Sequence, residues 1–266
     1  ISECLVGSEM CIRDSLIDGE SPIIWRSGIK HDCSKVMELV KKENGMYENG
    51  MKETFHIEED FIYPLVKSSD ISKFEGKVRK HLIVTQKKTS DETNTIEEKC
   101  PLTYEYLLKH STLLDNRKSS IYKNRARFCM FGIGDYSFFP YKIVISALYK
   151  STMFSLLYPL NGKPIMIDDT CYSIGFKNEK EASITLKILN GIHVQNFIKS
   201  ISFPDAKRVI TKDILMRIDL NKAFKLYTYQ ELGINEEEHY RYKKIIDTKP
   251  KKETKEALIT QLSLFN

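Results

Sequence analysis

The feature that most constrains this fold is a series of short β-branched and aromatic segments in the second half of the chain. They lie near residues 128–132, 140–148, 153–158, 163–167 and 171–176. Segments of this length and composition are typical of strands, and the Asn161-Gly162 pair between two of them favours a hairpin turn. A further strand is predicted over Val78–Gln86. Most of the sheet is therefore expected to be antiparallel.

Helical patterns accompany these strands. Residues 101–117 carry apolar side chains at helical spacing and start with a proline, which suits a first turn. Residues 178–190 have Asn178 as an N-cap and stop at Gly191. Shorter helices are predicted over 194–202 and 211–218. The expected fold class is α+β, with a curved, mainly antiparallel sheet and helices packed on one side.

Gly132-Ile-Gly134 raises the question of a nucleotide-binding loop. Such a loop follows a strand and opens a helix whose N-terminus faces the phosphates. Here the glycines are followed by aromatic residues, Pro140 and another strand pattern. A lone GxG is also a weak signal. The sequence therefore predicts a turn, which either approaches a partner closely or shapes the loop between two strands.

Composition divides the chain of 266 residues into three parts. Residues 1–15 begin without Met, show no periodicity and resemble translated sequencing-adapter text, so they are interpreted as a non-native leader. Residues 16–220 hold the strand and helix patterns and are expected to form the folded domain. Residues 221–266 are expected to be a Lys-rich linker and tail, because Lys243–Glu256 has almost no apolar content.

Bulk properties restrict the class of protein. No apolar run approaches the ~20 residues of a membrane helix. The six cysteines form no CxxC pair and no signal peptide is evident, so a cytoplasmic location with reduced thiols is expected. His31-Asp32-Cys33 has no second ligand pair, and no metal site is predicted. The net charge of +5 permits a polyanionic partner without requiring one.

The strongest functional signal is the basic segment 117–127, RKSSIYKNRAR, with five basic residues and no acid. Cationic groups bind phosphate oxygens by charge-assisted hydrogen bonds, and hydroxyls and amides supply further donors. The candidate DNA-binding residues in it are Arg117, Lys118, Ser119, Ser120, Tyr122, Lys123, Arg125 and Arg127. Blocks of like charge are also commonly solvated loops, which is the open alternative.

Aromatic residues and two further basic clusters extend this signal. The basic segment leads into Tyr136 and Phe138, whose rings would stack on bases or wedge between them. Ordinary core packing is the alternative for these rings. The remaining candidates are Arg26, Lys30, Lys207, Arg208 and Lys212. Three basic loops on one sheet scaffold would clamp the backbone of double-stranded DNA.

Six short motifs in order resemble a known family. They are WRSGIKHDC (25–33), YPLVKSSD (63–70), LLDNRKSS (113–120), FGIGDYSF (131–138), DDTCY (168–172) and FPDAKR (203–208). Together they resemble the C-terminal target-recognition region of N6-adenine DNA methyltransferases of restriction–modification systems. The likeness is to the Eco57I-like and TaqI-like enzymes and covers roughly residues 20–220, so residues 16–220 are interpreted as a DNA target-recognition domain.

The resemblance implies an enzyme that uses S-adenosylmethionine and flips an adenine out of the duplex to methylate it. In that family a separate N-terminal domain with an Asn/Asp-Pro-Pro-Tyr/Phe motif performs catalysis. This sequence contains no Pro-Pro dipeptide. The catalytic domain and its S-adenosylmethionine are therefore expected outside this chain, with no catalytic residue and no cofactor within it. The implied partners are double-stranded DNA and a restriction endonuclease subunit.

The end of the chain, QLSLF (261–265), looks like the short peptide by which bacterial proteins dock on the replication sliding clamp. Apolar side chains of such a peptide fill a pocket on the clamp, and a flexible linker delivers them. The candidate residues are Gln261, Leu262, Leu264 and Phe265. A frayed terminal helix that packs on the domain is the alternative.

Two other functions remain open at this stage. Asp168 or Asp169, with Asp205 and Lys207 downstream, loosely resembles a nuclease centre in which carboxylates hold Mg²⁺ and a lysine helps activate water. The chain would then be a magnesium-dependent DNA endonuclease. A non-catalytic specificity subunit is the second alternative, which differs mainly in whether the catalytic domain lies on the same chain.

Overall fold

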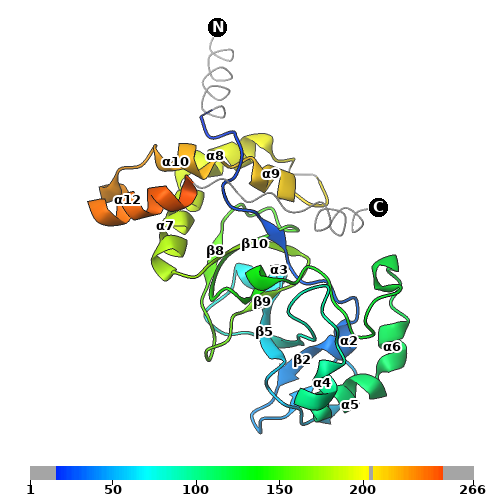
Figure 1. The fold of residues 1–266 in the computed structure, drawn as a ribbon. Coiled ribbons are helices and arrows are strands. Elements are labelled where there is room, and N and C mark those ends of the chain that lie inside the picture. Colours follow the sequence, from blue (N-terminus) through cyan, green and yellow to red (C-terminus); the bar gives the residue numbers. More distant parts are fainter. Residues whose placement is uncertain (1–15, 204–205, 248–266) are drawn as a thin grey trace.

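The computed structural model describes residues 16–203 and 206–247. Within them the strands form two sheets, one of four strands and one of six (Figure 1). The strands are β1 (Arg26–Ser27), β2 (Glu38–Lys41), β3 (Tyr47–Glu48), β4 (Thr54–Phe55), β5 (Ile62–Val66), β6 (Lys80–Ile83), β7 (Tyr141–Ser146), β8 (Ser155–Leu157), β9 (Met166–Ile167) and β10 (Cys171–Phe176). The sheet orders are β1-β10-β7-β8 and β4-β3-β2-β6-β5-β9, and every pairing except β5 with β9 is antiparallel.

Helices gather in two groups along the chain. The first group holds α2 (Ser34–Met37), α3 (Ser68–Ile71), α4 (Thr95–Lys99), α5 (Pro101–Lys109) and α6 (Ser111–Asp115). The second holds α7 (Glu179–Asn190), α8 (Ile192–Ile201), α9 (Lys212–Met216), α10 (Leu220–Phe224), α11 (Tyr229–Leu232) and α12 (Glu236–Ile246). Two single 3-10 turns, η1 (Ser120–Tyr122) and η2 (Asp135–Phe138), interrupt the loops. In Figure 1 the second group lies at one end of the molecule and α4–α6 at the other.

The four-stranded sheet is covered by the second helix group. Alternate residues of β7, such as Ile143 and Ile145, are fully buried in one core with Trp25 and with the apolar faces of α7 and α8. The side chain of Asn178 accepts hydrogen bonds from the first-turn amides of α7, at 2.8 Å from Lys180 N. Burial of this apolar face drives the packing, and the cap fixes where the helix starts.

The six-stranded sheet packs against α4–α6 through a second core that contains Leu39, Leu82 and Leu107. A third, smaller core joins the two sheets. It combines Val66 from the six-stranded sheet with Val144 from the four-stranded sheet, and both are fully buried. The two sheets therefore share apolar contacts, which hold the loops at their common end in a fixed relation.

The α+β class and the mainly antiparallel pairing predicted from the sequence are confirmed. The strands are divided over two sheets, and each sheet has its own helices. The hairpin turn at Asn161-Gly162 is present, with φ of 51° and 75° between the paired residues Leu160 and Lys163. Residues 128–131 are buried, but the strand expected over 128–132 does not form. Phe131 pairs with Lys30 in an isolated bridge, whereas the amide of Cys129 donates locally to the carbonyl oxygen of Ala126.

The segment expected as a Lys-rich linker is ordered through its first half. Within residues 221–247, α10, α11 and α12 contribute Phe224, Leu232, Tyr242 and Ile246 to the core around the four-stranded sheet. The lysines lie on the exposed faces of these helices. The high lysine content of the segment therefore gave no indication that other residues in it are buried. The expected leader at 1–15, Asp205 and the tail from 248 onward lie outside the described residues.

No helix in residues 16–203 and 206–247 is long and apolar enough to cross a membrane. The described cysteines, Cys33, Cys100, Cys129 and Cys171, form no disulfide with one another.

Candidate nucleic-acid interface

Backbone from three separate segments meets where β1 leaves the four-stranded sheet. Ile29 forms a parallel bridge with Asp168, and Lys30 forms an antiparallel bridge with Phe131. A Cβ atom on Gly28 would lie 2.2 Å from the carbonyl oxygen of Asp168, so no side chain fits at this position. The glycine therefore allows the loop after β1 to lie directly against the loop before β10.

Gly132 serves the same junction from the other side. Its φ is +69°, and a Cβ atom there would lie 2.4 Å from the carbonyl oxygen of Gly28. Gly134 is followed by the four-residue turn η2, whose Ser137 hydroxyl accepts a hydrogen bond from Gly134 N at 3.3 Å. This geometry agrees with the prediction of a turn. The close approach that Gly28 and Gly132 permit is to the backbone of the protein itself, whereas a Cβ atom on Gly134 would lie 2.6 Å from the ring of Tyr136.

Arg117 was predicted to contact phosphate, and the structure gives it a different role. Its guanidinium donates to four backbone carbonyls, those of Leu114 (2.7 Å), Cys129 (2.6 Å), Arg127 (3.1 Å) and His31 (3.3 Å). It also lies 3.7 Å from the centre of the Tyr122 ring. Because these donors are used inside the protein, Arg117 ties the basic segment to the loop after β1.

Tyr122 and Arg127 are also engaged internally. The Tyr122 hydroxyl donates to the carbonyl oxygen of Lys30 at 3.3 Å, and burial raises the pKa of this phenol. Arg127 makes a two-nitrogen contact with the Asp115 carboxylate, with Nη2 at 2.7 Å. These two residues shape the basic segment and connect it to its neighbours.

The cations that face solvent are Lys118, Lys123 and Arg125. Their side chains are exposed and make no ion pair with any described residue. Ser119 and Ser120 lie between them at the start of η1. The basic segment therefore divides into an inner part that holds its shape and an outer part that presents unpaired positive charge.

The predicted stacking aromatics are less exposed than a base-binding surface requires. Phe138 is half-buried, and its ring meets the edge of Tyr63 with ring centres 5.7 Å apart. The Arg26 guanidinium lies 4.7 Å from the centre of the Tyr136 ring. Phe138 packs against the core of the six-stranded sheet, which favours the core-packing alternative for this ring.

The other predicted cations lie on the loop after β1 and in the segment from Lys207 to the start of α9. Lys30 forms an ion pair with Asp32 at 3.7 Å, and Arg208 Nη1 lies 3.5 Å from the hydroxyl of Tyr172 in β10. Lys207 is exposed and Lys212 is the first residue of α9. The contacts of Tyr122 and Arg117 with the loop after β1 place the basic segment beside Lys30.

Asp169 shows that the loop before α9 also reaches this surface. Burial is the main cause of a raised Asp169 pKa, and the Asp168 and Asp32 charges add to it, whereas Lys30 and Arg208 oppose it. Each of these charges is therefore close enough to act on one carboxylate. Sequence reasoning considered Asp169 only as a metal ligand, and no local pattern shows that it lies between two of the basic clusters.

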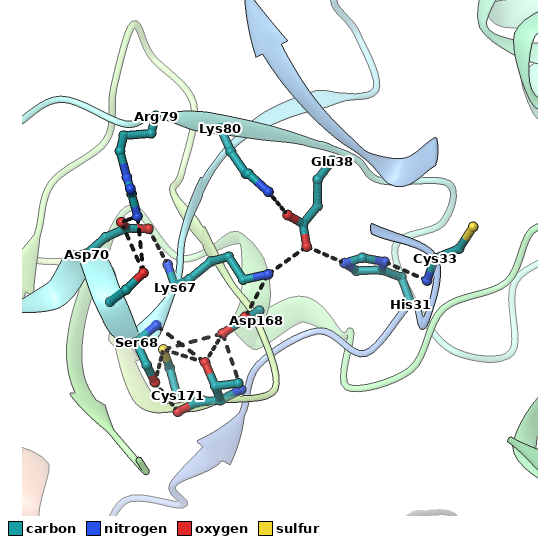
Figure 2. Close-up of polar contacts among 12 residues, drawn as sticks. His31, Cys33, Glu38, Lys67, Ser68, Asp70, Arg79, Lys80, Asp168 and Cys171 are labelled. Atoms are coloured by element: carbon teal, nitrogen blue, oxygen red, sulfur yellow. Dashed lines mark hydrogen bonds and ion pairs between the residues drawn. The ribbon is translucent and has the colours of Figure 1, made fainter. Parts of the chain in front are cut away.

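A buried ionic network centred on Glu38 lies next to the junction and contacts two of its loops through His31 and Asp168 (Figure 2). The Glu38 side chain is 1% exposed and contacts Lys67 Nζ at 2.7 Å, Lys80 Nζ at 2.5 Å and His31 Nε2 at 3.5 Å. Burial opposes its ionisation, but hydrogen bonds from these three partners outweigh burial and hold the pKa of Glu38 far below its ordinary value. Lys67 Nζ also lies 3.4 Å from Asp168, so the network reaches the loop that carries Asp169.

Asp168 is occupied by the protein. Besides Lys67, it accepts hydrogen bonds from the Thr170 hydroxyl and amide and from the Cys171 thiol. Asp205, the other carboxylate of the nuclease alternative, lies outside the described residues. Within the described ranges no group of three His, Cys, Asp or Glu side chains is placed to hold a metal ion.

Comparison with known proteins shows one clear relationship. No known family profile matches the chain. The chain is 42% identical over 215 residues to the Type II methyltransferase M.NspV of Nostoc sp. (strain ATCC 29411 / PCC 7524). The match covers 80% of this chain and 44% of the relative, so the chain spans less than half of that protein's length. The resemblance to methyltransferases expected from the sequence motifs is confirmed.

A search of solved structures also finds a Type IIL restriction-modification enzyme, MmeI, in complex with DNA. The two chains share a TM-score of 0.49 and 11% sequence identity, over 92% of this chain and 36% of the other. This likeness is below the level that would establish a shared fold.

Proposed function

We propose that this chain, as a relative of a Type II methyltransferase, is the DNA target-recognition part of an adenine-specific methyltransferase of a restriction–modification system. The relationship supplies the methyltransferase class. The observation that carries DNA recognition is the meeting of three basic segments at one junction. Recognition of a duplex requires cations that contact phosphates as well as side chains that reach base edges, and the exposed cations of these segments would supply the phosphate contacts.

The outer cations would hold the phosphate backbone. Lys118, Lys123, Arg125 and Lys207 are exposed, and unpaired ammonium and guanidinium groups gain most from a phosphate partner. Arg117 and Tyr122 would act indirectly, because they fix the segment that carries these cations. Phosphate contacts set register and orientation on DNA without reading sequence.

Catalysis and S-adenosylmethionine binding would belong to another part of the protein, because this chain has no Pro-Pro dipeptide. A restriction endonuclease partner and a cytoplasmic location follow from the same proposal. Docking of the tail residues Gln261, Leu262, Leu264 and Phe265 on a sliding clamp is a separate proposal. It fails if a peptide of these residues shows no binding to purified clamp in a fluorescence titration.

The deciding experiment measures binding of the chain to mixed-sequence duplex DNA by fluorescence anisotropy over a range of salt concentrations. We expect binding that weakens steeply as salt increases, because phosphate contacts release counterions. The double variant Lys123→Ala/Arg125→Ala removes two of the proposed contacts. It should lower the slope of log affinity against log salt by about 2 for every DNA sequence.

A matched control removes the same charge elsewhere. Lys225 and Lys243 are exposed on the α10–α12 helices, at the far end of the molecule from α6 (Figure 1). Lys225→Ala/Lys243→Ala should leave the salt slope unchanged. Absence of binding at low salt, or equal slopes for the two double variants, would contradict the proposed function.

A further inference from the structure

Asp169 has no hydrogen-bond or ion-pair partner within residues 16–203 and 206–247, although it lies in a surface that we expect to meet a polyanion. Its side chain is half-buried, and none of the described residues donates a hydrogen bond to it or forms an ion pair with it. Its neighbour Asp168, by contrast, forms an ion pair with Lys67 and accepts hydrogen bonds from Thr170 and Cys171. The fold therefore explains Asp168 and leaves Asp169 unexplained.

The charges around Asp169 indicate what kind of DNA group its carboxylate can bind. Lys30 and Arg208 come from two different loops and both act on its carboxylate, with Asp32 on the opposing side. Phosphate and sugar oxygens of DNA are acceptors or negatively charged, so a carboxylate gains nothing from them. The duplex groups that donate to a carboxylate are base amines, and in the major groove these are the N4 amine of cytosine and the N6 amine of adenine.

The loop that carries Asp169 is also held rigidly. Asp168 is fixed by Lys67 and by its backbone bridge to Ile29, and the Ser68 hydroxyl donates to the Thr170 carbonyl oxygen. Residues on both sides of Asp169 are therefore tied to other elements of the fold. A side chain that reads a base edge needs this kind of support, since a small displacement loses the hydrogen bond.

We infer that Asp169 is a specificity-determining residue, whose carboxylate accepts a hydrogen bond from the exocyclic amine of one cytosine or adenine in the target site. The inference rests on the proposed function, because it requires that this junction faces DNA. Lys30 and Arg208 then contact phosphate on either side, and their charge offsets the repulsion between the carboxylate and the DNA backbone.

The test compares Asp169→Leu with Asp32→Asn. Both variants remove one negative charge from the same junction, but only Asp169→Leu also removes a hydrogen-bond acceptor, since the oxygen of an Asn amide would still accept from a base amine. Asn tolerates the positive φ of Asp32 (51°). Duplexes bound by the wild-type chain and by each variant are selected from a randomised library and sequenced. We expect Asp169→Leu to lose at least about tenfold preference at one base pair, with equal or higher affinity for random DNA. Asp32→Asn should keep the wild-type preference.

A base analogue then identifies the atom. At the affected pair, purine replaces adenine or 2-pyrimidinone replaces cytosine, which removes only the exocyclic amine. The wild-type chain should lose about tenfold affinity for this duplex, and Asp169→Leu should be insensitive to the analogue. An unchanged preference profile in Asp169→Leu, or an equal loss of affinity for all sequences, overturns the inference while duplex binding itself still supports the proposed function. Failure of the wild-type chain to bind DNA overturns both.

Discussion

The two sheets bury charge in opposite ways. In the six-stranded sheet, Glu38 is surrounded by Lys67, Lys80 and His31, and the pKa of its carboxyl falls far below the ordinary value. In the four-stranded sheet, Lys142 is 2% exposed and donates to the carbonyl oxygens of Phe139 and Ile165, with no carboxylate partner among the described residues. Burial lowers the pKa of Lys142 to about 7. One sheet stabilises its buried charge with opposite charge, and the other tolerates a lysine that gives up its proton easily.

This difference shows where each part of the molecule depends on ionic contacts. The Glu38 network links strands to the loop that carries Asp169, so the candidate interface rests on charges. The core between the four-stranded sheet and its helices rests on apolar packing, and Lys142 lies on the opposite face of β7, the face that carries Val144. Removal of one partner in the first region should therefore be costly, whereas replacement of the lysine in the second should mainly change how stability depends on pH.

The largest effect is expected for Glu38→Gln. This change leaves Lys67 and Lys80 without their shared carboxylate and should lower the free energy of unfolding at pH 7 by about 3–5 kcal/mol. Because the folded-state pKa lies below the ordinary value of 4.5, the contribution of Glu38 is present above that pH and is lost as the pH falls below it. Urea denaturation of wild type and variant should therefore give converging stabilities in acid.

Glu59→Gln is the matched control for that change. Glu59 pairs with Lys41 beside the same sheet, but its side chain is 58% exposed. Solvent screening should limit its effect to less than about 1 kcal/mol. Equal decreases in the free energy of unfolding for the Glu38 and Glu59 variants would show that the buried network stabilises the fold no more than an exposed ion pair does.

Arg117→Ala should have the next largest effect. It removes hydrogen bonds to several carbonyls and should lower the free energy of unfolding by about 2 kcal/mol. Arg125 lies eight positions further along the same basic segment and is exposed to solvent, so Arg125→Ala should change the free energy of unfolding by less than about 0.5 kcal/mol. The free energies of unfolding of both variants, measured by thermal unfolding, distinguish an arginine that stabilises the fold from one that faces solvent. A destabilised Arg125 variant would place both arginines in the same structural role.

Lys142→Met tests the four-stranded sheet. Since the folded chain releases the Lys142 proton near pH 7 and the unfolded chain releases it near 10.5, the unfolded state binds more protons between these values. The wild-type free energy of unfolding should therefore gain up to about 1.4 kcal/mol per pH unit from this residue as the pH rises. The variant should lack that gain, and Lys199→Met on the exposed face of α8 should retain it in pH-dependent denaturation.

The smallest effect is expected for Asn178→Ala at the start of α7. Loss of the cap should lower the free energy of unfolding by about 1 kcal/mol. The effect should be independent of pH between 5 and 9, because the cap carries no charge. A strong pH dependence would mean that this region also relies on ionic contacts.

Local sequence chemistry predicted the parts of the fold that depend on neighbouring residues. The Asn178 cap, the stop at Gly191 and the Asn161-Gly162 hairpin follow from adjacent side chains and backbone preferences. The division into two sheets could not be predicted in this way, because it depends on a core that joins Val66 to Val144, far apart along the chain.

The sequence predicted which segments of the site carry positive charge, but it did not predict where their side chains point. The basic segments were found from charge, but a charge run does not show that Arg117 turns inward to carbonyls or that Phe138 lies on Tyr63. Glu38 gave no signal, since its partners at Lys67 and Lys80 are 29 and 42 positions away. The buried residues of α10–α12 were missed because lysines surround them in the sequence.

The ties made by Arg117 and Tyr122 end on backbone carbonyls, including those of Lys30 and His31. Every residue type carries such a carbonyl, so these ties do not depend on which side chains stand at the receiving positions. Evolution or an engineer could rewrite the outer side chains of these loops while the frame stays in place. Under the proposed function, a scaffold of this kind would acquire new DNA targets by exchange of a few residues, with little loss of foldability.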